Sequence, residues 1–199
     1  MSTVHNLHIN TLVKTMHSKE IIGSYLYSDM SISPLLADRQ RALGLIFDTD
    51  AGGGVWIMAL ADTPCAGAHS PADLTASVRA TAAGCGGIEW QVAGARHWMR
   101  LLVNVCGCAL DEIVDGFGSR VIGYSFDAAR ATARLSPVGI DLGAGGCCYW
   151  TSTVESDGSA SIVGYGEIRE DPMPYTDADL AEGVMRLRLV ALVNGLPCL

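Results

Sequence analysis

Residues 41–62 read RALGLIFD-TDAGGG-VWIMALAD, with two apolar runs of strand length on either side of a glycine-rich connection. Apolar runs of about four to eight residues that are flanked by Asp and Gly are typical of β-strands. The three consecutive glycines, 52–54, suit a turn that needs positive φ angles. The stretch therefore predicts a β-hairpin with strands over 41–48 and 55–62.

A second hairpin is predicted further along the chain. Residues 147–155 and 159–167 are separated by a short turn that contains Asp157-Gly158, and Asp-Gly is a strong signal for a tight hairpin. Residues 88–92 alternate apolar and polar side chains, which is the pattern of a half-buried strand. Two further strands are expected over 120–126 and 131–135. These elements predict a mainly antiparallel sheet.

Helices are expected to cover one face of this sheet. Helical spacing or helix-start signals occur over 11–27, 70–84 and 177–194. The segment 98–117 is ambiguous: its apolar residues fit a helical stripe, but a strand over 98–106 followed by a helix over 108–116 fits as well. We favour the second interpretation, because Gly107 weakens a long helix.

The predicted fold class is α+β, with a mainly antiparallel sheet built from β-hairpins and helices packed on one face. The order of hairpin and then helix occurs in three units, over 41–84, 88–116 and 147–194. We expect a single domain over 1–199. Its N-terminal segment, 1–38, is expected to be helical in part, and the hairpin-plus-helix units fill 41–195.

Composition excludes several classes of protein. The chain has 199 residues and a net charge of −8, and its few Lys and Arg disfavour direct nucleic-acid binding. No stretch approaches the roughly 20 uninterrupted apolar residues of a membrane helix. The N-terminus lacks the order of a secretion signal, so a cytoplasmic location is expected. Seven cysteines, an odd number without a C-x-x-C spacing, disfavour a complete disulfide framework and a zinc site.

Asp48 and Asp50 follow the apolar run of the first hairpin as a D-x-D motif. This motif resembles the first motif of haloacid-dehalogenase-type phosphotransferases. The resemblance implies that Asp48 is a nucleophile, Asp50 a general acid, and that a magnesium ion lies between carboxylates. It covers only these few residues, and the downstream Lys and paired acidic motif of that family are missing. Asp is also common at turns, where its side chain accepts hydrogen bonds from backbone amides.

Cys147 and Cys148 follow a glycine-rich stretch and precede two aromatic residues, an arrangement loosely similar to thiol hydrolase sites. A nucleophilic thiolate needs a nearby cation or base, and His97 or His69 could serve as the base. A strand supplies no helix dipole to lower the pKa of these thiols. Adjacent strand residues face opposite sides, so a core position for one cysteine and an edge position for the other is favoured.

Asp111, Glu112 and Asp115 form an acidic cluster. On a helix over 108–116, Asp111 and Asp115 would share a face and could hold a divalent cation. Such residues are more often the solvated side of an amphipathic helix.

These observations favour an intracellular, non-enzymatic protein-binding protein of inhibitor, immunity or adaptor type. It would act through its acidic surface, which suits a partner protein with a basic surface. The alternatives are a cysteine-dependent hydrolase or transferase that uses Cys147 or Cys148, and a metal-dependent phosphotransferase or hydrolase that uses Asp48 and Asp50. We expect no cofactor and no membrane partner. Strand edges and the apolar C-terminal segment are compatible with a homodimer.

Overall fold

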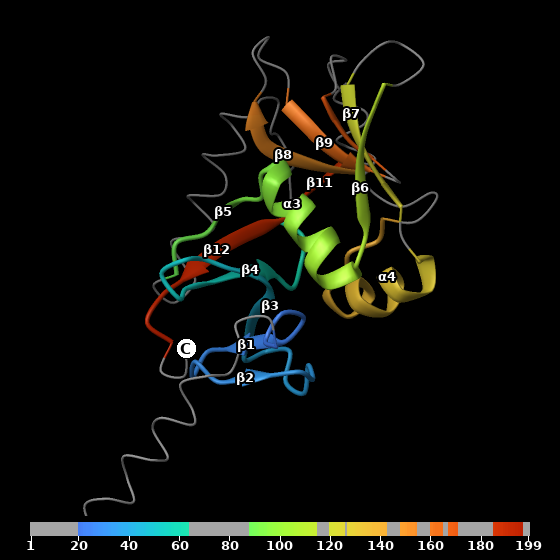
Figure 1. The fold of residues 1–199 in the computed structure, drawn as a ribbon. Coiled ribbons are helices and arrows are strands. Elements are labelled where there is room, and N and C mark those ends of the chain that lie inside the picture. The colour runs from blue at the N-terminus through green and yellow to red at the C-terminus, as the bar shows by residue number, and fades with distance from the viewer. Residues whose placement is uncertain are drawn as a thin grey trace, which may run out of the picture.

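The computed structural model describes residues 20–63, 88–114, 120–125, 127–142, 148–154, 160–164, 167–170 and 185–196. Their strands form two sheets, which Figure 1 shows as separate groups with a helix between them. The predicted helices over 70–84 and over the first part of 177–194 lie outside these residues.

Sheet A is antiparallel throughout and has the order β2-β1-β3-β4-β12-β5. Its strands are β1 (Tyr25–Tyr27), β2 (Ile32–Ser33), β3 (Ala42–Thr49), β4 (Val55–Ala59), β5 (Gln91–Val92) and β12 (Leu189–Val193). The predicted first hairpin is β3–β4, whose strands pair as neighbours.

Sheet B has the order β11-β8-β9-β10-β7-β6 and is antiparallel except for the parallel pair β11–β8. Its strands are β6 (Ala109–Val114), β7 (Arg120–Ser125), β8 (Cys148–Val154), β9 (Ala160–Gly164), β10 (Glu167–Glu170) and β11 (Met185–Leu187). The predicted second hairpin is β8–β9.

The helices of the described part are short. They are α3 (Ala95–Leu101), the π-helical η1 (Leu102–Cys106), α4 (Ala128–Leu135) and the 3-10 helix η2 (Ser136–Val138). Helix α3 continues directly into η1, and the pair lies between the two sheets in Figure 1. Gly107 ends this helical segment in the left-handed conformation, at φ 71°, which glycine adopts without steric cost.

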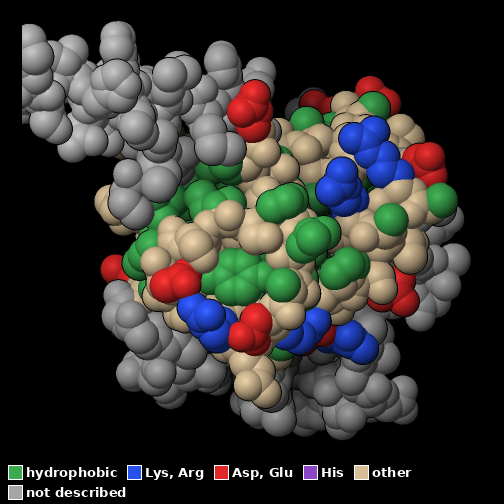
Figure 2. All heavy atoms as spheres, turned by 90° about the horizontal axis from the view of Figure 1, so that it is seen from below, with side chains coloured by type: hydrophobic (Ala, Val, Ile, Leu, Met, Phe, Trp, Pro, Cys, Tyr) green, Lys and Arg blue, Asp and Glu red, His purple; other side chains and the backbone are tan. Residues whose placement is uncertain are grey.

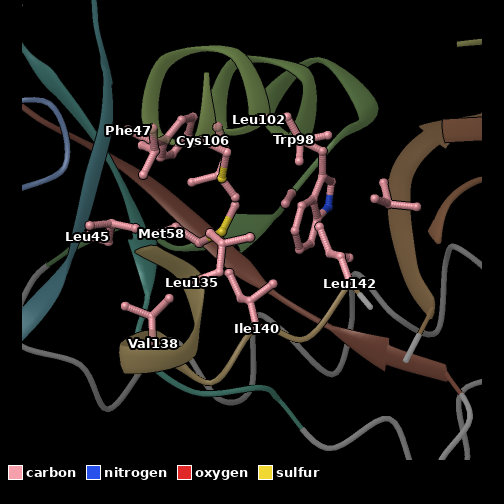
Figure 3. Close-up of a cluster of buried hydrophobic side chains, with 14 of the residues drawn as sticks. Leu45, Phe47, Met58, Trp98, Leu102, Cys106, Leu135, Val138, Ile140 and Leu142 are labelled. Atoms are coloured by element: carbon pink, nitrogen blue, oxygen red, sulfur yellow. The ribbon is translucent and has the colours of Figure 1, made fainter. Parts of the chain in front are cut away.

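The main hydrophobic core lies between the two sheets and under α3–η1. Trp98 of α3 is fully buried, and its ring centroid lies 4.7 Å from that of Tyr149 in β8. Figure 3 shows Trp98, Leu102 and Cys106 pointing from the helix toward Met58 of sheet A and toward the chain after α4. A second cluster of buried side chains lies on the other face of sheet A. Sheet A is therefore buried on both faces.

The C-terminal segment ties the two sheets together. Strand β11 pairs with β8 in sheet B, and β12, one residue later, pairs with β4 and β5 in sheet A. Arg188 is the residue between them, and its side chain has no exposed surface. Its guanidinium donates to the carbonyls of Ala59, Val138 and Gly139 and lies 2.5 Å from the carboxylate of Asp62. These contacts hold β4 and the end of η2 at the crossing.

The predicted helix over 177–194 is wrong for its described residues, which form β11 and β12. The sequence LVALV at 189–193 is apolar without interruption, so it satisfies a helical stripe and a central strand equally well. Successive residues such as Val190 and Ala191 are both buried, because β12 lies inside sheet A with cores on both faces. Tertiary pairing with β4 decides between the two structures.

The strand favoured over 98–106 is also wrong, since α3 and η1 occupy that stretch; the helical alternative holds as far as Cys106. The helix expected over 108–116 is β6 in its described residues. The strand expected over 131–135 is part of α4, whose first turn is capped by Asp127 Oδ1, which accepts from the amides of Ala129 and Arg130.

Two shorter differences concern the N-terminal half. The helix expected over 11–27 is wrong for its described residues, since 20–23 form a turn and Tyr25–Tyr27 form strand β1; residues 11–19 lie outside the described residues. The strand over 88–92 is limited to Gln91–Val92. The predicted alternation of burial nevertheless holds, since Trp90 and Val92 are buried while Glu89 and Gln91 are exposed.

The fold is α+β with mostly antiparallel sheets, as the sequence predicts. The hairpins β3–β4, β6–β7 and β8–β9 supply six of the twelve strands of the described residues. In the described ranges, no helix combines the length and hydropathy that a membrane span requires.

Candidate functional site

A cleft of about 480 Å³ lies between the β3–β4 hairpin and α3. Its lining comes from the end of β3 and the turn after it, from β4, and from one side of the helix. The lining residues are Asp48, Thr49, Asp50, Ala51, Trp56, Arg96, His97 and Arg100. The cleft therefore brings together segments about 45 residues apart in the chain.

A β-bulge at the end of β3 positions Asp48. Ile46 pairs with Ile57 and Asp48 pairs with Trp56, so Phe47 is an extra residue between two successive pairs. A bulge of this kind bends the strand and changes the direction of the side chains beyond it. The Phe47 carbonyl accepts a hydrogen bond from Asn104 Nδ2 at 3.1 Å.

Asn104 belongs to the π-helical turn η1, the second irregular element at the cleft. Its Nδ2 also lies 3.3 Å from Asp48 Oδ1, while Arg100 Nη1 lies 3.6 Å from Asp48 Oδ2. The Asp48 side chain is 18% exposed, so both of its oxygens face partners on the helix and little water. Asp48 thus joins β3 to the α3–η1 segment.

Asp50 organises the hairpin turn. Its Oδ1 accepts from the amide of Gly54 at 2.5 Å, and the backbone amides of Asp50 and Gly53 close the same turn. Gly53 has a φ of 82°, which explains a glycine at that position. A Cβ at Gly54 would lie 2.4 Å from Asn194 Oδ1, so the Asn194 side chain would have to move to admit one. The positive φ at Gly53 agrees with the glycine-rich hairpin turn that the sequence predicts.

His97 lies in the first turn of α3, at the inner wall of the cleft. Its Nδ1 accepts from the amide of Gly94 at 3.0 Å, as the third residue of a capping box does. The neutral ring therefore carries its proton on Nε2, which is a donor. Burial lowers the pKa of His97, the nearby Arg96 lowers it further, and Asp48 opposes both. The ring is neutral at neutral pH.

Trp56 supplies the aromatic surface of the cleft. Its ring centroid lies 4.7 Å from that of His97, with an angle of 48° between the planes. The ring centroid of Phe47 lies 6.3 Å from that of the same imidazole, with the two planes perpendicular. The stack fixes the orientation of His97 from one side, and its hydrogen bond with Gly94 fixes it from the other.

Helix α3 is anchored to sheet B at its N-terminus. The amide of Ala95 donates to Thr153 Oγ1 at 2.9 Å, and a Cβ at Gly94 would lie 3.2 Å from Ser152 Oγ and from Thr153 Oγ1. The start of the helix is therefore packed closely against β8. The cleft is built by a helix that sheet B holds and a hairpin that belongs to sheet A.

The predicted thiol site is not assembled around His97 in the described residues. Cys147 lies outside them, and Cys148, half-buried at the start of β8, does not line the cleft that contains His97. Cys106 and Cys108 are buried, and burial raises the pKa of both thiols, that of Cys106 to about 12.

The two acidic predictions have different outcomes. Asp48 and Asp50 do line one cleft, but no cluster of three His, Cys, Asp or Glu suited to a metal ion occurs within the described residues. Asp111 and Glu112 lie on strand β6 and Asp115 lies outside the described residues, so the helical spacing that would bring Asp111 and Asp115 to one face does not apply.

Sequence reasoning missed Trp56, Arg96, Arg100 and Asn104 as residues of the site. The spacing of Arg96 and Arg100 would have placed both on one side of a helix, but only if residues 95–101 had been assigned as helix. Comparison of the chain with family models, with curated proteins and with solved structures gave no match.

Proposed function

We propose that the chain is a binding protein for a small polar molecule, which the cleft between the β3–β4 hairpin and α3 holds without covalent chemistry. The cleft volume of about 480 Å³ lies within the range of roughly 300–1,000 Å³ that small-molecule sites occupy. Its lining combines the aromatic ring of Trp56 with four charged side chains, His97 and the Thr49 hydroxyl, so it is more polar than most such sites. A lining of this kind suits a ligand that is itself polar.

The observation that carries this proposal is the meeting of two backbone irregularities at one cleft. The bulge at Phe47 and the π-helical turn that contains Asn104 are joined by the hydrogen bond between these residues. Both kinds of irregularity are enriched next to functional sites, because each changes the direction of a side chain at the expense of regular pairing. Here they bring Asp48 to the cleft beside Arg100.

The hydrogen bonds of the cleft favour binding over acid–base or nucleophilic chemistry. A general base needs a free lone pair within reach of the substrate, and the Nδ1 lone pair of His97 is taken by the Gly94 amide. Asp48 faces Asn104 and Arg100, and Asp50 holds the turn through Oδ1 and keeps only Oδ2 for a ligand. We therefore assign these side chains to orientation of a ligand.

Thermal unfolding in the presence of a panel of amino acids, organic acids, amines, sugars and nucleosides tests the proposal. A ligand that binds only the folded chain raises the unfolding midpoint with its concentration. The midpoint shift should be reduced in Trp56→Ala and in Arg96→Gln. It should be unchanged in Arg41→Gln, which removes an exposed arginine paired with Asp29. The proposal would be contradicted if no compound of the panel gives a midpoint shift that depends on Trp56 and Arg96.

The protein partner expected from the sequence stays a prediction, as does a cytoplasmic location. On the face that Figure 2 shows, acidic and basic side chains both surround a group of hydrophobic ones. This face therefore has no single sign of charge that would select a basic partner. We place small-molecule binding ahead of protein binding for this reason.

A further inference from the structure

The two walls of the cleft carry opposite charges. Asp48 and Asp50 lie on the wall formed by β3 and its turn, while Arg96 and Arg100 lie one helical turn apart on α3. His97 is neutral, so the charges of the lining sum to zero. A cleft of this kind has no net attraction for a simple anion or cation, but it has a strong internal dipole.

Some of these charged groups have capacity for another partner. Arg96 is exposed and makes no ion pair or hydrogen bond with the described residues. Arg100 Nη1 is 3.6 Å from Asp48 Oδ2, which is longer than a hydrogen bond. Asp50 uses Oδ1 for the Gly54 amide, and no described residue donates to its Oδ2.

We propose that the ligand of the cleft is a small zwitterion of the α-amino acid class. Its carboxylate binds Arg96 and Arg100, its ammonium group binds Asp50, and its side chain packs against Trp56. This inference rests on the proposed function of the cleft and names the chemistry of the ligand.

A zwitterion fits the cleft better than a singly charged molecule for an electrostatic reason. A carboxylate gains charge-assisted hydrogen bonds from two guanidinium groups, which present paired donors of suitable geometry. A lone anion would make the same contacts but would place uncompensated negative charge close to Asp48 and Asp50. The ammonium group of a zwitterion removes that repulsion and contacts an acceptor. The ring of Trp56 adds an apolar surface for the ligand's side chain.

Calorimetric titration of the full chain with the common protein amino acids tests the inference. Each amino acid that binds is then compared with its carboxamide, which lacks the carboxylate, and with its N-acetyl derivative, which lacks the ammonium group. Loss of either charge should weaken binding by roughly tenfold or more, the effect of one hydrogen bond to a charged group.

Two variants assign the ends of the ligand. Arg96→Gln should remove most of the preference for the free amino acid over its carboxamide. Asp50→Asn should remove most of the preference for the free amine over the N-acetyl derivative, while its Oδ1 still accepts from the Gly54 amide. Arg41→Gln removes one positive charge, as Arg96→Gln does, but outside the cleft, and it should change neither preference.

The outcomes separate this inference from the proposed function. If singly charged or neutral compounds bind the cleft as tightly as any amino acid, the ligand class is wrong and small-molecule binding stands. Unchanged preferences in Arg96→Gln and Asp50→Asn would likewise overturn the ligand class. If no compound of either panel gives a midpoint shift or a binding signal that depends on Trp56 and Arg96, both the ligand class and the proposed small-molecule binding are wrong.

Discussion

Arg188→Met tests the role of the buried arginine at the crossing between the sheets. The guanidinium is fully buried and donates to three carbonyls, those of Ala59, Val138 and Gly139, besides its ion pair with Asp62. Met keeps an unbranched apolar chain in the same space and removes every polar contact. The substitution therefore leaves the carbonyls without their donor and Asp62 with one cation fewer.

The expected loss follows from these contacts. Removing one partner of a buried ion pair costs about 3–5 kcal/mol, because the other polar groups stay buried without compensation. Asp62 keeps Arg186, whose Nη1 lies 2.9 Å from its Oδ2, and its side chain is 21% exposed. The carboxylate is thus not isolated, which places the expected decrease in the free energy of unfolding near the lower value, about 3 kcal/mol. A domain has about 5–15 kcal/mol in total, so the variant should fold with a much smaller margin.

Urea denaturation followed by far-UV circular dichroism measures this decrease from the midpoint and slope. Arg41→Met is the matched control, because it removes an arginine whose ion pair with Asp29 is about half exposed on both sides. Exposed pairs contribute about 0–1 kcal/mol, so the control should lie close to wild type. If Arg188→Met loses no more stability than Arg41→Met, the crossing does not depend on the buried guanidinium, and the reasoning is refuted.

Three further predictions concern the cleft and the core. Burial and Arg96 lower the pKa of His97 in the folded state. As the pH falls below about 6.5, the unfolded chain therefore takes up the proton first, and the free energy of unfolding decreases. Urea titrations over this pH range should show a smaller decrease in His97→Gln than in the wild type. Asp50→Ala removes the acceptor of the Gly54 amide and should cost about 1 kcal/mol in the same assay, whereas Asp50→Asn should stay near wild type. Burial raises the pKa of Cys106 to about 12. Iodoacetamide at neutral pH should therefore label Cys106 far more slowly in the native chain than in the urea-unfolded chain. Equal labelling rates, measured by mass spectrometry, would contradict its burial.

The hairpins were predictable because their signals are local. The glycine-rich turn at 49–54 needs a positive φ at Gly53. This requirement selects glycine, and the sequence carries the evidence directly. The apolar runs on either side then pair because the turn brings them together, so β3 and β4 follow from residues 41–62 alone.

The segments 98–106 and 189–193 were not predictable in the same way, since apolar residues dominate both, with Arg100 and Asn104 the only polar residues in the first and none in the second. Periodicity distinguishes helix from strand where one side is polar, and residues 189–193, which lie inside sheet A with cores on both faces, have no such pattern. Residues 189–193 become a strand because β4 and β5 lie on either side of them. Residues 95–106 become helical because the space between two sheets holds Trp98 against Tyr149. In both cases the deciding partner is far away in the sequence.

The same reasoning explains why only part of the candidate site could be predicted. Asp48 and Asp50 stand out in the sequence because they share one strand end, and the structure does place both at the cleft. The opposite wall depends on a helix at 95–101, and the orientation of Asp48 depends on a bulge that joins it to Asn104, 56 residues later. A bulge and a π-helical turn are each departures from regular pairing, so neither has a periodic signature. Their coincidence is informative for that reason: two unrelated segments both depart from regular structure at the point where they meet, and the charged groups they carry face each other across one cleft.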